Sequence, residues 1–235
     1  MVLSVDIVLP VYNESRSLSS KFEELYYFLE NNIHDNWVIT IAENGSTDNT
    51  LDIAKKLQRK FNKSRVISNE IPGKGLALKN AWLSSTYDIL GYMDLDLSTD
   101  LEILPEFLRR LELNDTDFVI GSRLLKNSVV VGRSIKREII SRSYSFIFRM
   151  ALSVKFKDAQ CGFKFVKKKS ALKILDQCKD NGWFFDTELL YKAKKNNLSI
   201  CELPVTWVDD KDSKVRIIST IFKDILGLIR LRIEK

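Results

Sequence analysis

Apolar residues in the first half of the chain follow two patterns that alternate along the sequence. Short runs rich in branched and aromatic residues are typical of buried strands, and they occur at 5–9, 38–42, 65–68, 89–93 and 118–121. The intervening segments repeat apolar residues at helical spacing, and these are 18–31, 48–61, 74–84 and 101–113. Because strands that alternate with helices form parallel sheets covered on both faces, we expect an α/β fold with a Rossmann-like, mixed but mostly parallel sheet.

The pattern is less regular after residue 121. Apolar spacing predicts strands at 162–166 and 199–203, and helices at 135–154, 170–178 and 187–195. The last segment, 213–235, repeats isoleucine and leucine at helical spacing and carries lysines and arginines, which predicts an amphipathic basic helix. We therefore expect one domain over 1–212, followed by a C-terminal helix that packs on the domain, on a partner subunit or on an anionic membrane surface.

Two aspartates separated by one residue follow the apolar run 89–93. Asp94 and Asp96 are expected at the carboxyl end of that strand, which is the edge where open α/β sheets bind ligands. Two close carboxylates repel each other, and a divalent cation such as Mg²⁺ or Mn²⁺ relieves that repulsion while it binds substrate phosphates. The simpler alternative is that the two acids only cap the strand before a turn.

Polar turns also follow the first two predicted strands. They are Pro10-Val11-Tyr12-Asn13-Glu14 and Glu43-Asn44-Gly45-Ser46-Thr47-Asp48. Because the carboxyl ends of neighbouring parallel strands face a common crevice, we expect both turns to lie beside Asp94 and Asp96. Each turn alone has the composition of an ordinary connection between a strand and a helix. Their order and their spacing before the acid pair favour a shared ligand site.

Composition narrows the classes of function. The net charge of +6 over 235 residues favours anionic partners such as phosphates or acidic lipids. Three cysteines without a Cys-x-x-Cys spacing, and one histidine, His34, in a polar break, argue against a disulfide scaffold, a zinc site and histidine-based catalysis. The chain enters a strand near its first residue and has no long apolar run, so we expect neither a signal peptide nor a membrane-spanning helix.

The two turns, the segment Gly73-Lys74-Gly75 and the acid pair resemble the motifs of the family 2 glycosyltransferases, which have the GT-A fold of nucleotide-diphospho-sugar transferases. Along nearly the whole chain the sequence is similar to their dolichyl-phosphate mannosyl- and glucosyltransferase branch. The resemblance implies a nucleotide-sugar donor, GDP-mannose or UDP-glucose, and dolichyl or polyprenyl phosphate as the acceptor. It also implies Mg²⁺ or Mn²⁺ as the cofactor, bound by Asp94 and Asp96, with Ser98 where many mannosyl relatives carry Gln.

The resemblance also implies which residues contact the nucleotide sugar. They are Pro10, Tyr12, Glu14, Glu43, Asn44, Gly45, Lys74, Asp94, Leu95, Asp96, Asp186 and Lys214. Glu43 and Asn44 stand where relatives usually have two aspartates. The resemblance therefore does not decide which nucleotide base the site binds. Lys74 near a predicted helix N-terminus suits a phosphate on physical grounds, and a solvated lysine at a plain helix start is the alternative. Asp186 belongs to the segment 183–188, which lies near the sugar in this branch.

Arg123, Arg137 and Ser141 match the residues that hold the lipid phosphate in the mannosyl branch. Arg137 and Ser141 are four residues apart, so they share one face of the predicted helix. Guanidinium groups bind phosphate oxygens in pairs and stay protonated, which suits an acceptor phosphate. A basic, solvated helix face is the alternative. The excess of apolar residues over 139–152 suits an isoprenoid chain or a membrane interface.

The sequence therefore predicts an inverting hexosyltransferase that loads mannose or glucose on polyprenyl phosphate, with Asp94, Asp96, Arg123 and Arg137 as the catalytic group. A phosphate acceptor is already anionic, so no general base is required. We expect a cytoplasmic protein, peripheral on the cytoplasmic face of a membrane. One alternative is a transferase for a soluble glycan, with Asp186 as base. The other is a noncatalytic basic protein that binds membrane or nucleic acid; nucleic acid is disfavoured because aromatic residues do not interleave with a basic patch.

Overall fold

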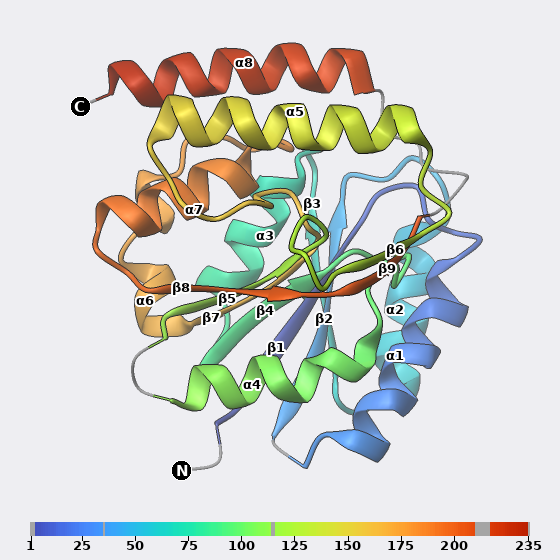
Figure 1. The fold of residues 1–235 in the computed structure, drawn as a ribbon. Helices are drawn as coiled ribbons and strands as arrows, with labels where there is room; N and C mark the ends of the chain where they lie inside the picture. Colours follow the sequence, from blue (N-terminus) through green and yellow to red (C-terminus); the bar gives the residue numbers. More distant parts are fainter. Residues whose placement is uncertain (1–2, 35, 114–115, 210–216, 235) are drawn as a thin grey trace.

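A seven-stranded sheet forms the centre of the domain in the computed structural model, which describes residues 3–34, 36–113, 116–209 and 217–234, with backbone only for 217–222 (Figure 1). The strands lie in the order β3-β2-β1-β4-β7-β5-β8. Their bounds are β1 Val5–Val11, β2 Trp37–Asn44, β3 Ser64–Asn69, β4 Ile89–Met93, β5 Phe118–Ser122, β7 Phe163–Lys167 and β8 Ile200–Pro204. Neighbours pair in parallel except β7, which is antiparallel to both β4 and β5. The expected mixed, mostly parallel sheet is confirmed.

Helices cover both faces of the sheet, and each face has its own core. One core is built under α1 Leu18–Asn32, α2 Thr50–Lys60 and α4 Leu104–Glu112. The other is built under α3 Lys74–Leu83, α5 Ile135–Leu152, α6 Lys168–Leu172 and α7 Phe185–Lys195. Successive residues of β1 enter opposite cores, Ile7 the first and Val8 the second, as the two-residue period of a strand requires.

Two predicted helices are shorter than their apolar pattern. The segment 101–113 opens with a 3₁₀ turn, Leu101–Ile103, and becomes α4 only where Pro105 occupies the first helical turn, a position where a missing N–H has no cost. The segment 170–178 divides into α6 and a second 3₁₀ turn, Leu175–Gln177. Neither change moves the residues at the carboxyl edge of the sheet.

A small parallel ribbon that the sequence did not predict closes one side of that edge. It consists of β6 Val129–Val131 and β9 Thr206–Val208. The Val208 N–H donates to the Ser98 carbonyl (2.9 Å), and Trp207 bridges to Thr99. The ribbon therefore fixes the segment that follows the acid pair.

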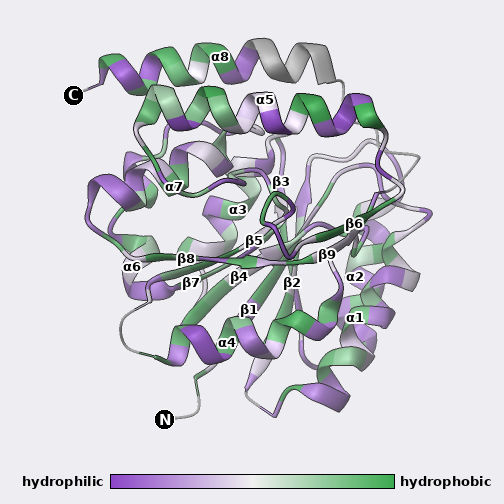
Figure 2. Ribbon diagram, in the orientation of Figure 1, coloured by the Kyte–Doolittle hydropathy of each residue, from purple (hydrophilic) through white to green (hydrophobic). Residues whose placement is uncertain are grey.

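The helices α5 and α8 Ile217–Ile233 lie side by side as an outer layer of the domain (Figure 1). Figure 2 shows hydrophobic residues along both helices as well as along the strands. Leu228 and Leu231 of α8 are buried in the same core as Phe148 of α5. Within the described ranges, no helix is both long enough and apolar enough to cross a membrane.

Candidate active site

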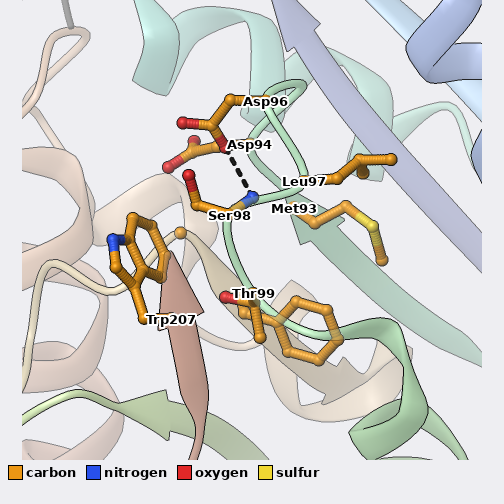
Figure 3. A pocket seen from close by; sticks show the side chains of 9 residues that line it. Met93, Asp94, Asp96, Leu97, Ser98, Thr99 and Trp207 are labelled. Carbon is orange, nitrogen blue, oxygen red and sulfur yellow. Dashed lines mark hydrogen bonds between the residues drawn. The ribbon is translucent and has the colours of Figure 1, made fainter. Parts of the chain in front are cut away.

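The acid pair lies in a tight turn directly after β4. The Asp94 N–H donates to the Gly162 carbonyl, and the Ser98 N–H donates to Asp96 Oδ1. Both hydrogen bonds are 3.0 Å long. Leu97 takes a left-handed φ of 52°, which closes the turn. Figure 3 shows the carboxylates of Asp94 and Asp96 on the same side of this turn, with the Ser98 hydroxyl directed towards them. The two acids therefore lie together at the carboxyl end of the strand.

Gly162 leaves the space that the Asp94 carboxylate fills. A Cβ at this glycine would lie 1.8 Å from Asp94 Oδ2, so no side chain fits there without moving the acid. Asp94, Asp96 and Ser98 offer the hard oxygen ligands that Mg²⁺ and Mn²⁺ prefer. In the described part of the chain, no group of three His, Cys, Asp or Glu side chains could hold a metal ion. The residues fit a cation whose other ligands are water and substrate phosphate oxygens, which is the usual mode for Mg²⁺.

Lys74 places its ammonium group beside the acid pair from the first turn of α3. Its side chain is 8% exposed, and Nζ lies 2.8 Å from Asp94 Oδ1 and 3.7 Å from Asp186 Oδ2. The ring centroids of Tyr92 and Trp183 each lie 4.9 Å from the same Nζ. Burial lowers the pKa of Lys74, but the charges of Asp94 and Asp186 outweigh burial and raise it. The site therefore contains a fixed positive charge.

Asp186 lies behind Lys74 and is itself buried. It is 3% exposed, and its Oδ1 accepts the Tyr92 hydroxyl and lies 2.9 Å from Lys164 Nζ. Burial raises the pKa of Asp186, but Lys164 and Lys74 outweigh burial and lower it. Because both carboxylate oxygens contact cations, Asp186 serves in this arrangement to hold Lys74. A contact between Asp186 and the sugar stays a prediction.

The glycines on either side of Lys74 allow α3 to pack against the segment before α7. A Cβ at Gly73 would lie 2.5 Å from the Asn181 carbonyl oxygen, and one at Gly75 would lie 2.6 Å from Phe185 Cβ. The absence of side chains at both glycines lets two protein segments approach each other, which brings Lys74 and Asp186 together.

The turns after β1 and β2 are hydrogen-bonded to each other. Asn13, with a left-handed φ of 54°, accepts the Thr47 N–H through Oδ1 (2.8 Å), and its own N–H donates to Ser46 Oγ (3.0 Å). Tyr12 next to it is exposed, and the Glu14 N–H donates to Thr50 Oγ1 (2.8 Å). Since Pro10 and Ala42 are register partners in β1 and β2, the two turns meet at one edge, as predicted.

Glu43 and Asn44 hold the second turn and the start of α3 in place. Glu43 is 2% exposed; it accepts the Ser46 N–H through Oε1 (2.5 Å) and the Ser68 hydroxyl through Oε2 (2.7 Å). Asn44 Oδ1 accepts the Gly73 N–H (2.5 Å). Gly45 takes a φ of 69°, a conformation that favours glycine. The predicted contact of Glu43 or Asn44 with a nucleotide remains a prediction.

Arg123 follows β5 and points into the domain. Its Nε and Nη2 donate to the two carboxylate oxygens of Asp158 (2.8 and 2.9 Å), and its guanidinium carbon lies 4.8 Å from the ring centroid of Trp207. Burial lowers the pKa of Arg123, but the Asp158 charge outweighs burial and raises it. Arg123 and Ser141 line one cavity, as the predicted acceptor site requires.

Arg137 lies one helical turn before Ser141 on α5. Its Nη1 is 3.2 Å from Asp209 Oδ2, and Asp209 also accepts the Trp207 Nε1–H (2.8 Å). Arg137 therefore does not line the cavity of Arg123 directly but is connected to it through Trp207 and Asp209. Lys214, the last predicted contact, lies outside the described residues.

Several residues of the site were missed by sequence reasoning. Lys164, Tyr92, Asp158, Trp207 and Asp209 were not predicted to have roles here. One signal was available: Lys164 is a charge in the middle of an apolar run, Phe163-Lys164-Phe165-Val166, and such a residue is buried only with a partner. Its partner lies on α7, which the local pattern does not reveal.

The fold and this site together define a class of protein. A model of the family described as Glycosyl transferase family 2 matches residues 6–175, and the chain belongs to this family of transferases. The expected family is thus confirmed.

Individual relatives narrow the comparison. Glycosyltransferase AglD of Haloferax volcanii is 34% identical over 228 residues, which cover 96% of this chain and 36% of that protein, so the chain spans about a third of its length. The dolichyl-phosphate beta-glucosyltransferase of Dictyostelium discoideum is 30% identical over 241 residues, 97% of this chain and 73% of that protein. That of Saccharomyces cerevisiae is 28% identical over 249 residues, 97% of this chain and 74% of that protein.

Solved structures share the GT-A fold at low identity. Glucosyl-3-phosphoglycerate synthase from Mycobacterium tuberculosis, crystallised with Mn²⁺, UDP and glucosyl-3-phosphoglycerate, has a TM-score of 0.71 and 16% identity, covering 98% of this chain and 80% of that chain. Mannosyl-3-phosphoglycerate synthase from Rubrobacter xylanophilus has a TM-score of 0.73 and 18% identity, covering 99% and 74%. The predicted fold class is confirmed.

Proposed function

We propose that this glycosyltransferase moves a hexose, with inversion, from a nucleotide diphosphate sugar to polyprenyl phosphate. The proposal rests on Trp207. Its ring lines the pocket that contains Asp94 and Asp96, and it also lies against the guanidinium group of Arg123. A donor bound at Asp94 and Asp96 and an acceptor phosphate bound at Arg123 would meet across this ring. UDP-glucose is the donor we favour over GDP-mannose, because several similar proteins are named dolichyl-phosphate beta-glucosyltransferases.

On the donor side, the residues supply positive charge where the leaving diphosphate becomes more negative. A divalent cation held by Asp94, Asp96 and Ser98 would act as a Lewis acid on the diphosphate oxygens. Lys74 adds a second positive charge, which Asp94 and Asp186 already hold in position. Because that charge does not have to be reoriented during the reaction, it lowers the barrier more effectively than a mobile lysine would.

On the acceptor side, Arg123 aligns the nucleophile. Asp158 fixes two of its nitrogens, and Nη1 has no partner among the described residues, so it is left for a phosphate oxygen. An acceptor phosphate oxygen forms the new bond to the anomeric carbon while the bond from that carbon to the diphosphate breaks, which inverts the configuration. The phosphate is already anionic, so no proton has to be removed.

A soluble glycan as acceptor is the weaker alternative. A sugar hydroxyl requires a general base, and Asp186 was the candidate for that role. In the structure Asp186 is buried, both of its oxygens contact cations and its pKa is lowered. A base in this state accepts a proton poorly near neutral pH. The geometry around Asp186 therefore supports the anionic acceptor.

The outer layer made by α5 and α8 supports a membrane surface as partner. Its exposed apolar residues are Ile135, Ile139, Phe146, Ile147, Met150, Ile225, Leu226, Ile229 and Ile233. Lys136, Arg142, Lys223 and Arg232 are exposed on the same two helices. A layer of amphipathic helices with apolar and basic side chains suits the surface of an anionic bilayer. An acceptor lipid held in the bilayer would reach Arg123 from α5.

A donor and acceptor screen tests the proposal. We would incubate the purified chain with radiolabelled UDP-glucose or GDP-mannose and farnesyl phosphate, with Mn²⁺, Mg²⁺ or EDTA, and count sugar in the organic phase. We expect lipid-linked sugar that disappears with EDTA. Asp96→Asn should lower kcat by about 100-fold or more, as removal of other charge-stabilising groups does. Asp52→Asn, at an exposed position of α2, is the matched control. Transfer to soluble sugars only would overturn the proposal.

A further inference from the structure

The inner face of α8 is built into the domain. Leu228 and Leu231 of α8 are buried in one core with Phe148 of α5. At Gly227 a Cβ would lie 2.4 Å from the ring of Phe184, so the backbone of α8 contacts that ring directly. These apolar contacts are enough to hold α8 against the domain. Docking of the helix therefore does not require a buried charged residue.

Asp224 departs from this apolar face. It is 2% exposed, its Oδ2 accepts a hydrogen bond from Gln160 Nε2 (2.7 Å), and its buried Oδ1 has no hydrogen-bond partner among the described residues. Burying a carboxylate costs free energy, and an apolar side chain at the same place would hold the helix at least as well. The position of Asp224 is therefore better explained by its hydrogen bond to Gln160 than by docking of α8.

The partner of Asp224 is a wall of the candidate acceptor cavity. Gln160 lines the same cavity as Arg123, Ser141 and Tyr144. Tyr144 also shares a hydrogen bond with Thr187 Oγ1 (2.9 Å). One carboxylate on α8 thus binds a side chain that shapes the cavity.

Gln160 also belongs to the segment that aligns Arg123. Two residues before it, Asp158 binds the Arg123 guanidinium through both oxygens. The N–H groups of Lys157 and Asp158 donate to the Glu202 carboxylate over 2.8 to 3.0 Å, which fixes the start of the segment. The hydrogen bond from Gln160 to Asp224 fixes its other end.

We propose that Asp224 is a positioning residue of the acceptor site: from α8 it holds Gln160, and through Gln160 the cavity and the segment that aligns Arg123. This inference rests on the proposed function. It assigns the C-terminal helix a part in acceptor binding, whereas the donor site at Asp94 has no contact with Asp224.

The test separates the two substrates. Asp224→Ala should raise the KM for farnesyl phosphate, and its Kd in calorimetry, by about fivefold or more, the equivalent of one lost hydrogen bond. The KM for the sugar donor should stay within about twofold of that of the unmodified chain, because the donor site is not touched. Asp224→Asn keeps an acceptor for Gln160 and should restore acceptor binding. Gln160→Ala should reproduce the Asp224→Ala effect without adding to it.

A matched control variant weakens the docking of α8 on the domain without changing a residue that lines the cavity. Glu234, the residue directly after α8, pairs with Lys179 (2.8 Å) and Lys192 (3.4 Å), so Glu234→Gln weakens docking only. The inference is overturned if Glu234→Gln raises the KM for the acceptor as much as Asp224→Ala does. It is also overturned if Asp224→Ala changes the KM for neither substrate.

Hydrogen exchange distinguishes failure of this inference from failure of the proposed function. Asp224→Ala should speed amide exchange over 157–161, and this readout needs no substrate. If the unmodified chain binds no farnesyl phosphate, the proposed function fails. Unchanged exchange over 157–161 in a folded Asp224→Ala protein would overturn the inference itself.

Discussion

The indole ring of Trp207 lies 4.8 Å from the guanidinium carbon of Arg123 and forms one wall of the turn that carries Asp94. Trp207 comes from β9, and Arg123 follows β5, so the contact depends on the ribbon that closes the edge of the sheet. Its Nε1–H donates to Asp209, which pairs with Arg137. One side chain thus connects the donor side of the site with both arginines.

Substitution of Trp207 should change kcat/KM for the acceptor more than kcat/KM for the sugar donor. Trp207→Phe keeps an aromatic face for Arg123 and should stay within about threefold of the unmodified kcat/KM for farnesyl phosphate. Trp207→Leu removes the cation–π contact, which is worth about 1–2 kcal/mol, and should lower kcat/KM about tenfold. Steady-state kinetics with each substrate varied in turn checks this. Equal kcat/KM for the two variants would contradict it.

Lys74 should be required for stability as well as for activity. Lys74→Met leaves Asp186 with one cation fewer in a buried place, and we expect the free energy of unfolding to fall by about 3 kcal/mol. Adding Asp94→Asn should restore at least half of that loss, because Asp94 is the carboxylate nearest to Lys74, whereas Asp186 keeps Lys164 as its partner. Urea denaturation measures both. Lys60→Met breaks an exposed ion pair with Glu23 and should change stability by less than about 1 kcal/mol.

The stability of the chain should depend on pH through Asp224. Burial raises the pKa of Asp224 to about 6 from its ordinary value near 3.8, with nearby charges of Asp180 and Asp186 in the same direction. Because the folded state holds this proton more tightly than the unfolded state, the stabilisation is complete below about pH 4 and is lost as pH rises through about 6.

Asp224→Asn mimics the protonated acid and should therefore be more stable than the unmodified chain at pH 8, by at most about 3 kcal/mol for that shift. The difference should vanish below about pH 4 in thermal unfolding. Asp117→Asn is the contrasting control: burial raises the pKa of Asp117, but hydrogen bonds from Ser170 and Ser199 outweigh it and lower the pKa. Its replacement should destabilise at pH 7 and have little effect in acid.

Membrane binding should depend on the outer layer. Ile229→Glu puts a charge on the exposed face of α8, and we expect it to weaken flotation with vesicles of phosphatidylcholine and phosphatidylglycerol about tenfold or more. Leu83→Glu, at an equally exposed position at the end of α3, should leave flotation unchanged. Loss of binding in both variants would argue against a specific role of the outer layer.

The elements of the first half could be predicted from sequence because each has a local pattern. The run before Asp94 has the composition of a buried strand, and the acids appear where it ends, so the place of the acid pair was predictable. The turns after β1 and β2 were also predictable, since consecutive parallel strands carry their turns to one edge.

The remaining parts of the site depend on pairings far apart in the sequence. Nothing local shows that β7 enters the sheet between β4 and β5 in the opposite direction, and this insertion is what places Gly162 against Asp94. The contact between Tyr92 and Asp186 likewise joins β4 to α7. The sequence shows the two residues but not their partnership, because buried charges are satisfied by tertiary packing.

The insertion of β7 between β4 and β5 also determines the order in which the sheet can form while the chain is being synthesised. On the ribosome, β4 emerges well before the strand that covers it, since α4, β5 and α5 are made in between. A nascent chain stopped after α5 would expose the backbone of β4 along one side, a template on which foreign strands can pair. That edge of β4 stays unpaired until residue 167 has left the tunnel, so aggregation through it is a hazard created by the topology.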